Sequence, residues 1–437
     1  MTTAQLTASR QQVDYGTAAR FGWAYSTFRA GVLCFLLSVV FLPEFSHEGS
    51  ETSLAIYNKA AGGFRSIDLL ILFVAWCHVV ALGCIREKRV RFPARLAVPA
   101  AIFLACIAFA VGYGAKQGGS KFFFDWRGLA LGIALYFAWT FWIQDALDAE
   151  AAVRVFAIYV GLRIAALYGL YLAGQRDSVA GMSIPIFDGP VLSCIVFAGL
   201  LALSFQDSAR DWVSKLGWGV LGLGAYLFVL LCFRRTYWGE LAIGSMILLL
   251  RKKHHRLRSI ILVAVALCVA AAVLGSSFSS RLRSIDVTQD DSRFSADNAD
   301  HVNDLMDAWF QVQQSPILGI GVGTSYSTWH IRNWKSESVM VHNAVLHVWL
   351  KYGIVGLACY LWFHIALLMW LYRGSTSGRA ENRAFLAAAF AYMTAQFAMT
   401  LGFAPWPYSE LQLTTLMSFI VAAAVASQNN FAGRIHS

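Results

Sequence analysis

The chain contains few charged residues, and this scarcity excludes an ordinary soluble fold. Of its 437 residues, 14% are charged and 58% are hydrophobic. That is more apolar side chain than one soluble core can bury. Apolar runs close to the roughly 20 residues needed to cross a bilayer recur from end to end. The sequence therefore predicts a single integral membrane domain over residues 1–437, with no appended soluble module.

The sequence also shows no cysteine cluster, and its first residues do not have the pattern of a signal peptide. Its eight cysteines are dispersed within or beside apolar runs, so we expect packing residues, with no cysteine metal site and no structural disulfide. The polar start, MTTAQLTASRQQVDYGTAAR, has no apolar centre, so the first apolar run should remain as a span. The net charge of +10 resides mainly in short loops, which argues against a nucleic-acid partner.

Hydropathy predicts an all-α protein with about 12 transmembrane helices. The expected spans lie near residues 24–44, 67–85, 96–113, 128–144, 153–173, 189–205, 214–233, 237–250, 259–275, 343–371, 384–404 and 410–427. Basic residues gather after the second and the eighth of these spans. The positive-inside rule makes those loops, and with them both termini, cytoplasmic.

One connection, residues 276–342, is far longer than the others and falls on the outer side, between the ninth and tenth spans. Its length and its tryptophans and tyrosines predict a folded segment rather than a linker. Within it, DHVNDLMDAWFQVQQ carries apolar residues at helical spacing, namely Val302, Leu305, Met306, Trp309 and Val312. Ser315 and Pro316 follow as a stop signal. We expect an amphipathic helix on the outer face.

The run SPILGIGVG, residues 315–323, invites a nucleotide-binding interpretation. Its pattern is G-x-G-x-G, with Thr324 where a dinucleotide fingerprint has its third glycine, and no strand precedes it. A tight backbone turn, close to a ligand, is the better interpretation for Gly319 and Gly321.

His342 and Asn343 stand at the start of the tenth span, directly after the long loop. From the residues alone, a role as a helix cap or a hydrogen bond to nearby backbone is the first interpretation of His342, and a role as a base at the outer membrane face is the alternative. Gly353 and Gly356 follow within the span. Paired glycines could let another helix approach closely.

Arginines near or inside spans form the third signal. Arg163 lies near the middle of a span, where a cation should face a cavity, an anion or a carboxylate. Arg234 and Arg235 interrupt an apolar stretch, and Glu240 follows five residues after Arg235. A structural ion pair with Glu240 is the alternative. The arginines could instead surround one outer cavity suited to a pyrophosphate, because guanidinium groups bind phosphate oxygens bidentately. The candidates are Arg127, Arg163, Arg234, Arg235 and Arg293.

No metal or cofactor is expected. Asp290 and Asp291 lack further ligands at a suitable spacing, and a solvated turn explains them better. There is also no G-x-S-x-G nucleophile motif and no candidate catalytic cysteine on the outer side.

Taken in order, these motifs resemble the shared region of O-antigen ligases and O-antigen polymerases. SPILGIGVG, then outer loop, then HN-x9-G-x-x-G entering a span resembles that region, and FRRTYWGEL resembles its arginine-bearing helix break. The motifs cover roughly residues 235–356, and the span layout is similar over the whole chain. The resemblance implies a C-type glycosyltransferase fold in the bacterial inner membrane, with a periplasmic active site.

The resemblance further implies a metal-independent, inverting enzyme that moves a glycan from undecaprenyl pyrophosphate to a hydroxyl group. His342 matches the family's catalytic histidine, and Arg235 matches the arginine of the helix break. The family's loop arginine usually precedes a leucine by four residues, a pattern that neither Arg293 nor Arg281 meets.

We favour a ligase that attaches O antigen to the lipid A core, since only one outer loop is long, whereas polymerases commonly carry two. A polymerase that extends the lipid-linked glycan is the alternative. A lipid-linked glycan transporter or flippase is the rival of another class. It predicts charged residues along a route through the membrane and repeated halves, whereas the polar candidates here concentrate toward the outer side.

Overall fold

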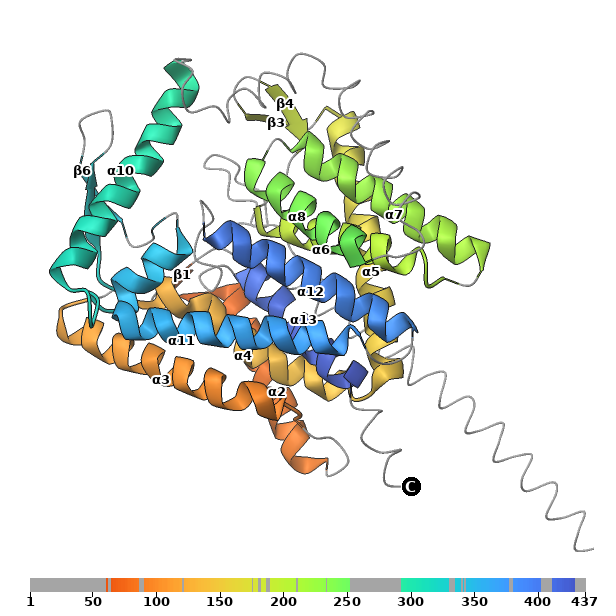
Figure 1. Ribbon diagram of the computed structural model, residues 1–437, viewed down its shortest axis with the longest axis horizontal. Coiled ribbons are helices and arrows are strands. Elements are labelled where there is room, and N and C mark those ends of the chain that lie inside the picture. The colour runs from red at the N-terminus through yellow and green to blue at the C-terminus, as the bar shows by residue number, and fades with distance from the viewer. Residues whose placement is uncertain are drawn as a thin grey trace, which may run out of the picture.

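The computed structural model describes residues 60–61, 64–85, 90–119, 122–174, 176–179, 182–185, 189–209, 211–232, 234–251, 292–329, 335–338, 341, 343–376, 380–401 and 411–428. Within them the chain is a bundle of helices with three short hairpins (Figure 1). The predicted spans near 24–44 and 259–275 lie outside the described residues, as does the start of the long loop.

Every other predicted span coincides with a helix. The helices are α2 (Ser66–Cys84), α3 (Ala94–Lys116), α4 (Phe122–Trp142), α5 (Ala146–Leu172), α6 (Gly189–Phe205), α7 (Trp212–Leu231), α8 (Arg235–Arg251), α11 (Ala344–Gly374), α12 (Ala380–Thr400) and α13 (Leu411–Gln428). Four of them, α3, α5, α7 and α11, are long and apolar enough to cross a membrane. The protein is therefore a helical membrane protein, and the count of about 12 spans stays a prediction.

Two helices begin earlier than hydropathy predicts, because polar residues belong to their first turns. Helix α4 begins at Phe122 rather than near residue 128 and so takes in Asp125 and Arg127. Helix α5 begins at Ala146 rather than near residue 153, because the Asp145 carboxylate caps it by accepting the Asp148 N–H at 2.9 Å. Polar residues lower the local mean hydropathy, so a hydropathy-based prediction starts each helix after them, whereas the folded helix includes them.

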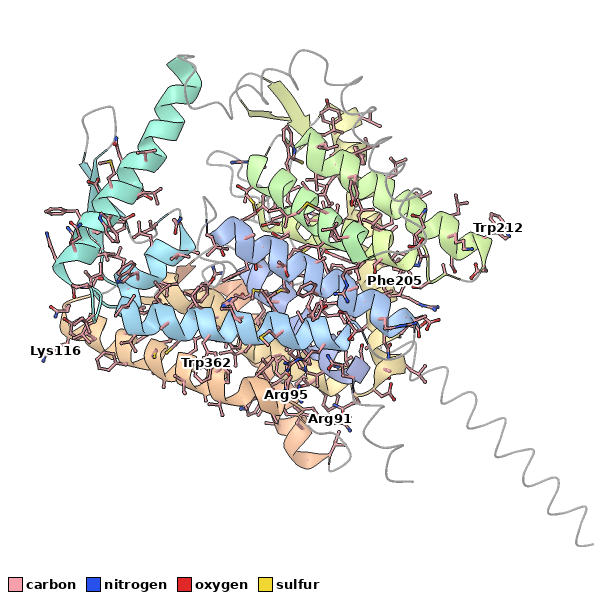
Figure 2. The ribbon with its side chains drawn as sticks, in the orientation of Figure 1. Arg91, Arg95, Lys116, Phe205, Trp212 and Trp362 are labelled. Atoms are coloured by element: carbon pink, nitrogen blue, oxygen red, sulfur yellow. The ribbon has the colours of Figure 1, made fainter. Side chains whose placement is uncertain are left out.

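The outer surfaces of several helices are apolar. Phe109 of α3, Ile158 of α5 and Val220 of α7 are each more than half exposed, as expected of side chains that face lipid. Arg95 and Lys116 lie at opposite ends of α3 (Figure 2), so charge flanks its apolar length.

The interior is closely packed. Gly132 of α4 lets Thr414 of α13 approach. Trp139 of α4 contacts Phe419 of α13 edge to face, with 5.3 Å between the ring centroids.

The predicted helix of the long loop is present as α10, from Ser292 to Gln314. It rises steeply from the ends of α3 and α11 (Figure 1). Its residues Ala308 and Val312 are buried against Tyr326 and Leu350. Only part of the predicted apolar face is buried. Val312 packs against the hairpin and α11, whereas Val302, Met306 and Trp309 are exposed.

The strands form three antiparallel hairpins: β1 (Ala60–Ala61) with β2 (Phe64–Arg65), β3 (Arg176–Val179) with β4 (Met182–Pro185), and β5 (Tyr326–Trp329) with β6 (Lys335–Ser338). The last pair follows the glycine-rich segment, with Tyr326 opposite Ser338. It packs against α10. The hydroxyl of Tyr326 donates to the Asp304 carboxylate, which fastens the hairpin to that helix.

Candidate functional site

The glycine-rich loop, residues 315–324, is inserted into a break in α11. Gly353 has φ 68° and ψ −175°, which no helical residue adopts. The break leaves nearby backbone groups without helical partners, and the loop supplies partners. The N–H groups of Ile320 and Gly321 donate to the carbonyls of Leu350 and Lys351 at 2.7 and 3.2 Å. Because an unpaired peptide group in apolar surroundings is costly, the loop makes the break tolerable.

The reverse contact closes the same junction, since the Ile354 N–H donates to the carbonyl of Pro316 at 3.0 Å. Such close approach requires glycine on both sides. A Cβ on Gly353 would lie 1.8 Å from the Ile317 carbonyl oxygen, and one on Gly319 would lie 2.5 Å from the Leu350 oxygen. Gly319 also has a positive φ of 70°.

The predicted tight turn at Gly319 and Gly321 is confirmed. Gly321 has φ 87°, and its Cα faces Gly114 of α3, where a Cβ would lie 2.4 Å from the Gly114 Cα. The expectation for Gly353 needs correction: it admits the backbone of this loop, and not a neighbouring helix. A Cβ on Gly356 would collide with the Cβ of Tyr352 at 2.2 Å, so this second glycine relieves crowding at the kink.

A buried ion pair fixes the loop in place. The Asp125 carboxylate, in the first turn of α4, lies 3.3 Å from the Lys351 Nζ of α11, and neither side chain is exposed. The same carboxylate accepts the Gly323 N–H at 2.8 Å, and the Lys351 ammonium donates to the Thr324 carbonyl. Helix α4, helix α11 and the loop therefore meet at one pair of charges.

His347 completes this group. Its Nε2 is 3.9 Å from an Asp125 carboxylate oxygen, longer than a hydrogen bond. Its Nδ1 faces the Val341 N–H at 3.4 Å and accepts from it. That assignment places the proton of a neutral ring on Nε2, toward Asp125. His347 thus connects the residue just before His342 to the buried ion pair.

Asp125, His347 and Lys351 were not among the residues selected from the sequence. A signal for them exists. Asn343, His347 and Lys351 recur every four residues along one apolar span, which puts them on one helix face. Asp125 interrupts the apolar run FFFDW. Ionisable residues inside membrane spans are rare and usually form pairs, so an acidic and a basic residue that both lie within apolar runs are expected to contact each other.

Among the predicted site residues, Asn343 is the N-cap of α11. Its side-chain oxygen accepts the Leu346 N–H at 2.9 Å, and its amide donates to the Leu401 carbonyl at 3.1 Å. His342 lies outside the described residues. Both of its neighbours in the chain make hydrogen bonds: the Val341 N–H donates to His347, and the Asn343 side chain bonds to the Leu346 N–H and to the Leu401 carbonyl.

The structure describes the side chains of three of the five predicted arginines, which lie on α4, on α5 and just before α8. Arg127 is half-buried on α4, two residues after Asp125. Arg163 is half-buried on α5, and its Nε is buried without a hydrogen-bond partner among the described residues. Arg234 is exposed, and its carbonyl accepts the N–H groups of Tyr237 and Trp238 in the first turn of α8. The side chains of Arg235 and Arg293 lie outside the described residues, so a shared pyrophosphate cavity stays a prediction.

Arg127, Arg163 and Arg234 line neither of two grooves found in the described part of the chain. The smaller groove, about 330 Å³, runs between α3, α4, α11 and α13 and is almost wholly apolar. Leu129, one helical turn beyond Asp125, lies in its wall. An apolar groove that begins so close to the ion pair suits the hydrocarbon part of a lipid.

Residues 213–361 match the family model described as O-antigen ligase. The matched segment contains α8, α10, the glycine-rich loop and the first half of α11. It thus includes His347 and Lys351, while Asp125 lies before it. No curated protein matches the chain. The predicted resemblance to this family is confirmed.

Proposed function

We propose that this protein, whose residues 213–361 are of the O-antigen ligase family, transfers a glycan between membrane-borne substrates. The donor is O-antigen glycan on undecaprenyl pyrophosphate, and the acceptor is a sugar hydroxyl of the lipid A core. The reaction takes place at the periplasmic face of the bacterial inner membrane, with inversion at the anomeric carbon and without a metal.

The observation that carries the proposal is the anchored start of α11. His342 lies between Val341, whose N–H is bonded to His347, and Asn343, which caps the helix and bonds to Leu401. A general base must stay within hydrogen-bond reach of the proton that it removes. Held backbone on both sides of His342 supports such a role, because rigid surroundings preserve catalytic geometry.

The chemistry assigns a role to each residue type. The acceptor hydroxyl oxygen attacks the anomeric carbon, and its proton passes to the His342 imidazole. The bond from that carbon to the pyrophosphate oxygen breaks, and its electron pair leaves with undecaprenyl pyrophosphate. Arginine side chains stabilise the negative charge that develops on the leaving group. Arg235 is the first candidate for this role, followed by Arg163, Arg127, Arg234 and Arg293.

Glycan transfer by the purified protein tests the proposal. Wild type and His342→Ala would receive undecaprenyl-pyrophosphate glycan and lipid A core, with and without a chelator. Attachment to the core by wild type alone, unaffected by the chelator, is expected. Glycan lengthening without core attachment would indicate a polymerase instead. Donor binding without transfer of either kind would favour a transporter.

A further inference from the structure

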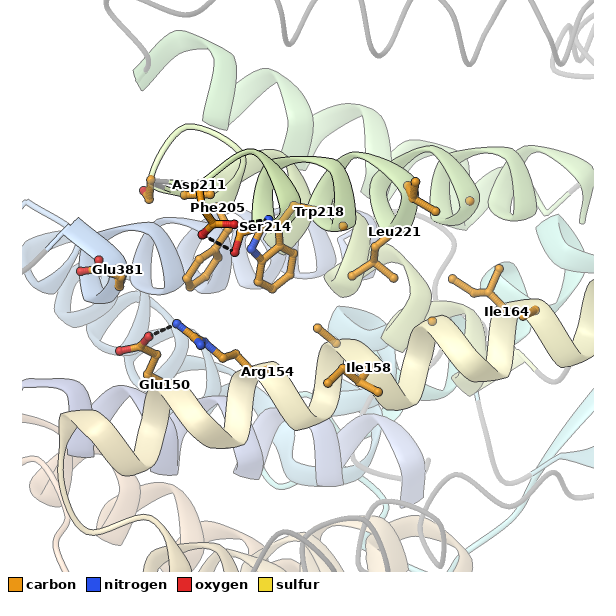
Figure 3. Close-up of a pocket in the computed structure, with 18 of the residues that line it drawn as sticks. Glu150, Arg154, Ile158, Ile164, Phe205, Asp211, Ser214, Trp218, Leu221 and Glu381 are labelled. Carbon is orange, nitrogen blue, oxygen red and sulfur yellow. Dashed lines mark hydrogen bonds and ion pairs between the residues drawn. The ribbon is translucent and has the colours of Figure 1, made fainter. Parts of the chain in front are cut away.

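A large groove in the described part of the chain lies between α5 and α7 and has a volume of about 1050 Å³ (Figure 3). Its mouth is lined by the first turns of α5 and α12. Helix α5 starts just after α4 ends, whereas Asp125 lies at the beginning of α4. A helix of that length spans about 30 Å. The mouth therefore lies at the opposite end of the helices from the glycine-rich loop, and the proposed transfer reaction does not use it.

One end of this groove is charged. Glu150 and Arg154 of α5 form an ion pair, and they face Asp211, the N-cap of α7, and Ser214 of α7 across the groove (Figure 3). Arg154 is largely exposed and uses one of its N–H groups on Glu150, which leaves other donors. Glu381, from the start of α12, adds a third carboxylate.

Two hydrogen bonds from Ser214 stabilise the ionised form of Asp211. Its carboxylate accepts the Ser214 N–H at 2.7 Å and the Ser214 hydroxyl at 2.8 Å. These bonds lower the pKa of Asp211 below its usual value. Among the described residues that line the groove, its charged end therefore carries the carboxylates of Glu150, Asp211 and Glu381 beside the guanidinium group of Arg154.

The rest of the groove is apolar. Ala157, Ile158, Ile164 and Leu221 line it, and Tyr168 lies toward its far end. From Ala157 to Tyr168 the helix rises by about 16 Å, close to half of the roughly 30 Å hydrocarbon thickness of a bilayer. The apolar part thus matches an acyl chain that occupies one leaflet.

We infer that this groove binds a phospholipid with an ammonium group in its headgroup, of the phosphatidylethanolamine type. The carboxylates receive the ammonium group, and Arg154 receives the phosphodiester. The acyl chain lies between α5 and α7. An anionic headgroup such as that of phosphatidylglycerol fits less well, because it would meet three carboxylates.

Glycines keep the groove open and offer a direct test. A Cβ on Gly217, which lines the groove on α7, would meet no atom within 4 Å. Gly217→Leu should therefore fill the groove without a clash. Gly169→Leu on α5 is the matched control, because Gly169 has equally open surroundings and lies outside the groove. A second pair comes from α5: Ile158 lines the groove and Leu162 does not, although they are 64% and 67% exposed.

The experiment measures the lipid that stays with the protein. The full chain would be reconstituted with equal amounts of phosphatidylethanolamine and phosphatidylglycerol, washed in detergent, and analysed by native mass spectrometry. We expect retained phosphatidylethanolamine to exceed phosphatidylglycerol by about fivefold, the effect of roughly one charge contact near a membrane surface. Gly217→Leu and Ile158→Trp should lose most of it, whereas Gly169→Leu and Leu162→Trp should keep it.

The preference for one headgroup over the other tests the role of the charged end separately. Glu150→Gln combined with Glu381→Gln should abolish the preference between the two lipids while leaving retained lipid in place. Equal retention of both lipids by wild type would overturn the inference. So would groove-filling variants that retain as much phosphatidylethanolamine as their matched controls. Glycan transfer does not enter this measurement, so its result is independent of the proposed reaction.

Discussion

Asp125 of α4 and Lys351 of α11 form an ion pair of 3.3 Å in which neither side chain is exposed. Two charges buried together are tolerated only when further hydrogen bonds compensate their lost hydration. Here the compensation comes from the glycine-rich loop, through the Gly323 N–H and the Thr324 carbonyl. The pair therefore holds three segments that are distant in sequence.

Removal of one partner of this pair should destabilise the protein strongly. Asp125→Asn or Lys351→Met would leave a buried charge uncompensated, and we expect a loss of about 3–5 kcal/mol in the free energy of unfolding. The double variant Asp125→Asn/Lys351→Met should lose less than the two single losses combined. Unfolding in mixed micelles would measure all three. Additive losses would contradict a direct interaction.

Gly353→Ala should prevent the loop from docking. The new Cβ would collide with the Ile317 carbonyl oxygen, and φ at this position is +68°. Both effects disfavour alanine. Gly112→Ala on α3 is the control, since a Cβ there meets no atom within 4 Å. Size-exclusion profiles and thermal unfolding should show a large loss for Gly353→Ala and almost none for Gly112→Ala. Equal behaviour of the two variants would refute the docked loop.

Asn343 serves two contacts that can be separated. Asn343→Ala removes both the helix cap and the bond to the Leu401 carbonyl, and the lost cap alone should cost about 1 kcal/mol of stability. Asn343→Asp keeps an acceptor for the Leu346 N–H and loses the donor to Leu401. Thermal unfolding should therefore rank wild type above Asn343→Asp, and Asn343→Asp above Asn343→Ala. An aspartate variant no better than alanine would argue against the cap.

His347 should act on glycan transfer as a positioning residue, through the backbone next to His342. His347→Phe keeps an aromatic ring and removes the acceptor for the Val341 N–H. One such hydrogen bond contributes about 1 kcal/mol, so we expect kcat to fall by about fivefold with KM nearly unchanged. His347→Gln, which can still accept that bond, should recover part of kcat. Loss of folded protein in both variants, without a change in kcat per folded molecule, would show a purely structural role.

Arg163 should contribute to donor binding if its half-buried guanidinium faces the pyrophosphate. Arg163→Lys keeps the charge and loses the bidentate geometry, so affinity for a lipid-pyrophosphate probe should fall about tenfold. Arg95→Lys, at the exposed start of α3, is the control and should bind as wild type. Microscale thermophoresis on folded samples would measure both. Unchanged affinity for Arg163→Lys would assign this arginine a structural role.

The apolar runs located the helices well, because lipid-facing and buried side chains alike must be apolar in a membrane protein. Their starting points were less predictable. Asp125 lies inside α4 although hydropathy placed the start after it, and its partner Lys351 is far away in sequence. A polar residue inside an apolar run shows that a partner is needed, and it does not show which residue that partner is.

The glycines show the same difference between what local sequence predicts and what depends on contacts between distant segments. Their spacing predicted a tight turn at Gly319 and Gly321, which is a local property of the backbone. It suggested a helix contact at Gly353, where the structure instead has a break filled by a loop. Which backbone fills a gap depends on the folded chain, since only there do the donors of the loop meet the carbonyls of α11.

The sequence by itself therefore determined the membrane class, the approximate positions of the described helices, the turn at Gly319 and the similarity of residues 213–361 to the O-antigen ligase family. Each of these follows from local pattern: hydropathy, glycine content and short motifs. The tertiary structure decided that Asp125, His347 and Lys351 form one buried group, and that a charged groove opens between α5 and α7 at the other end. Burial and pairing of charges depend on distances between segments, which no local pattern contains.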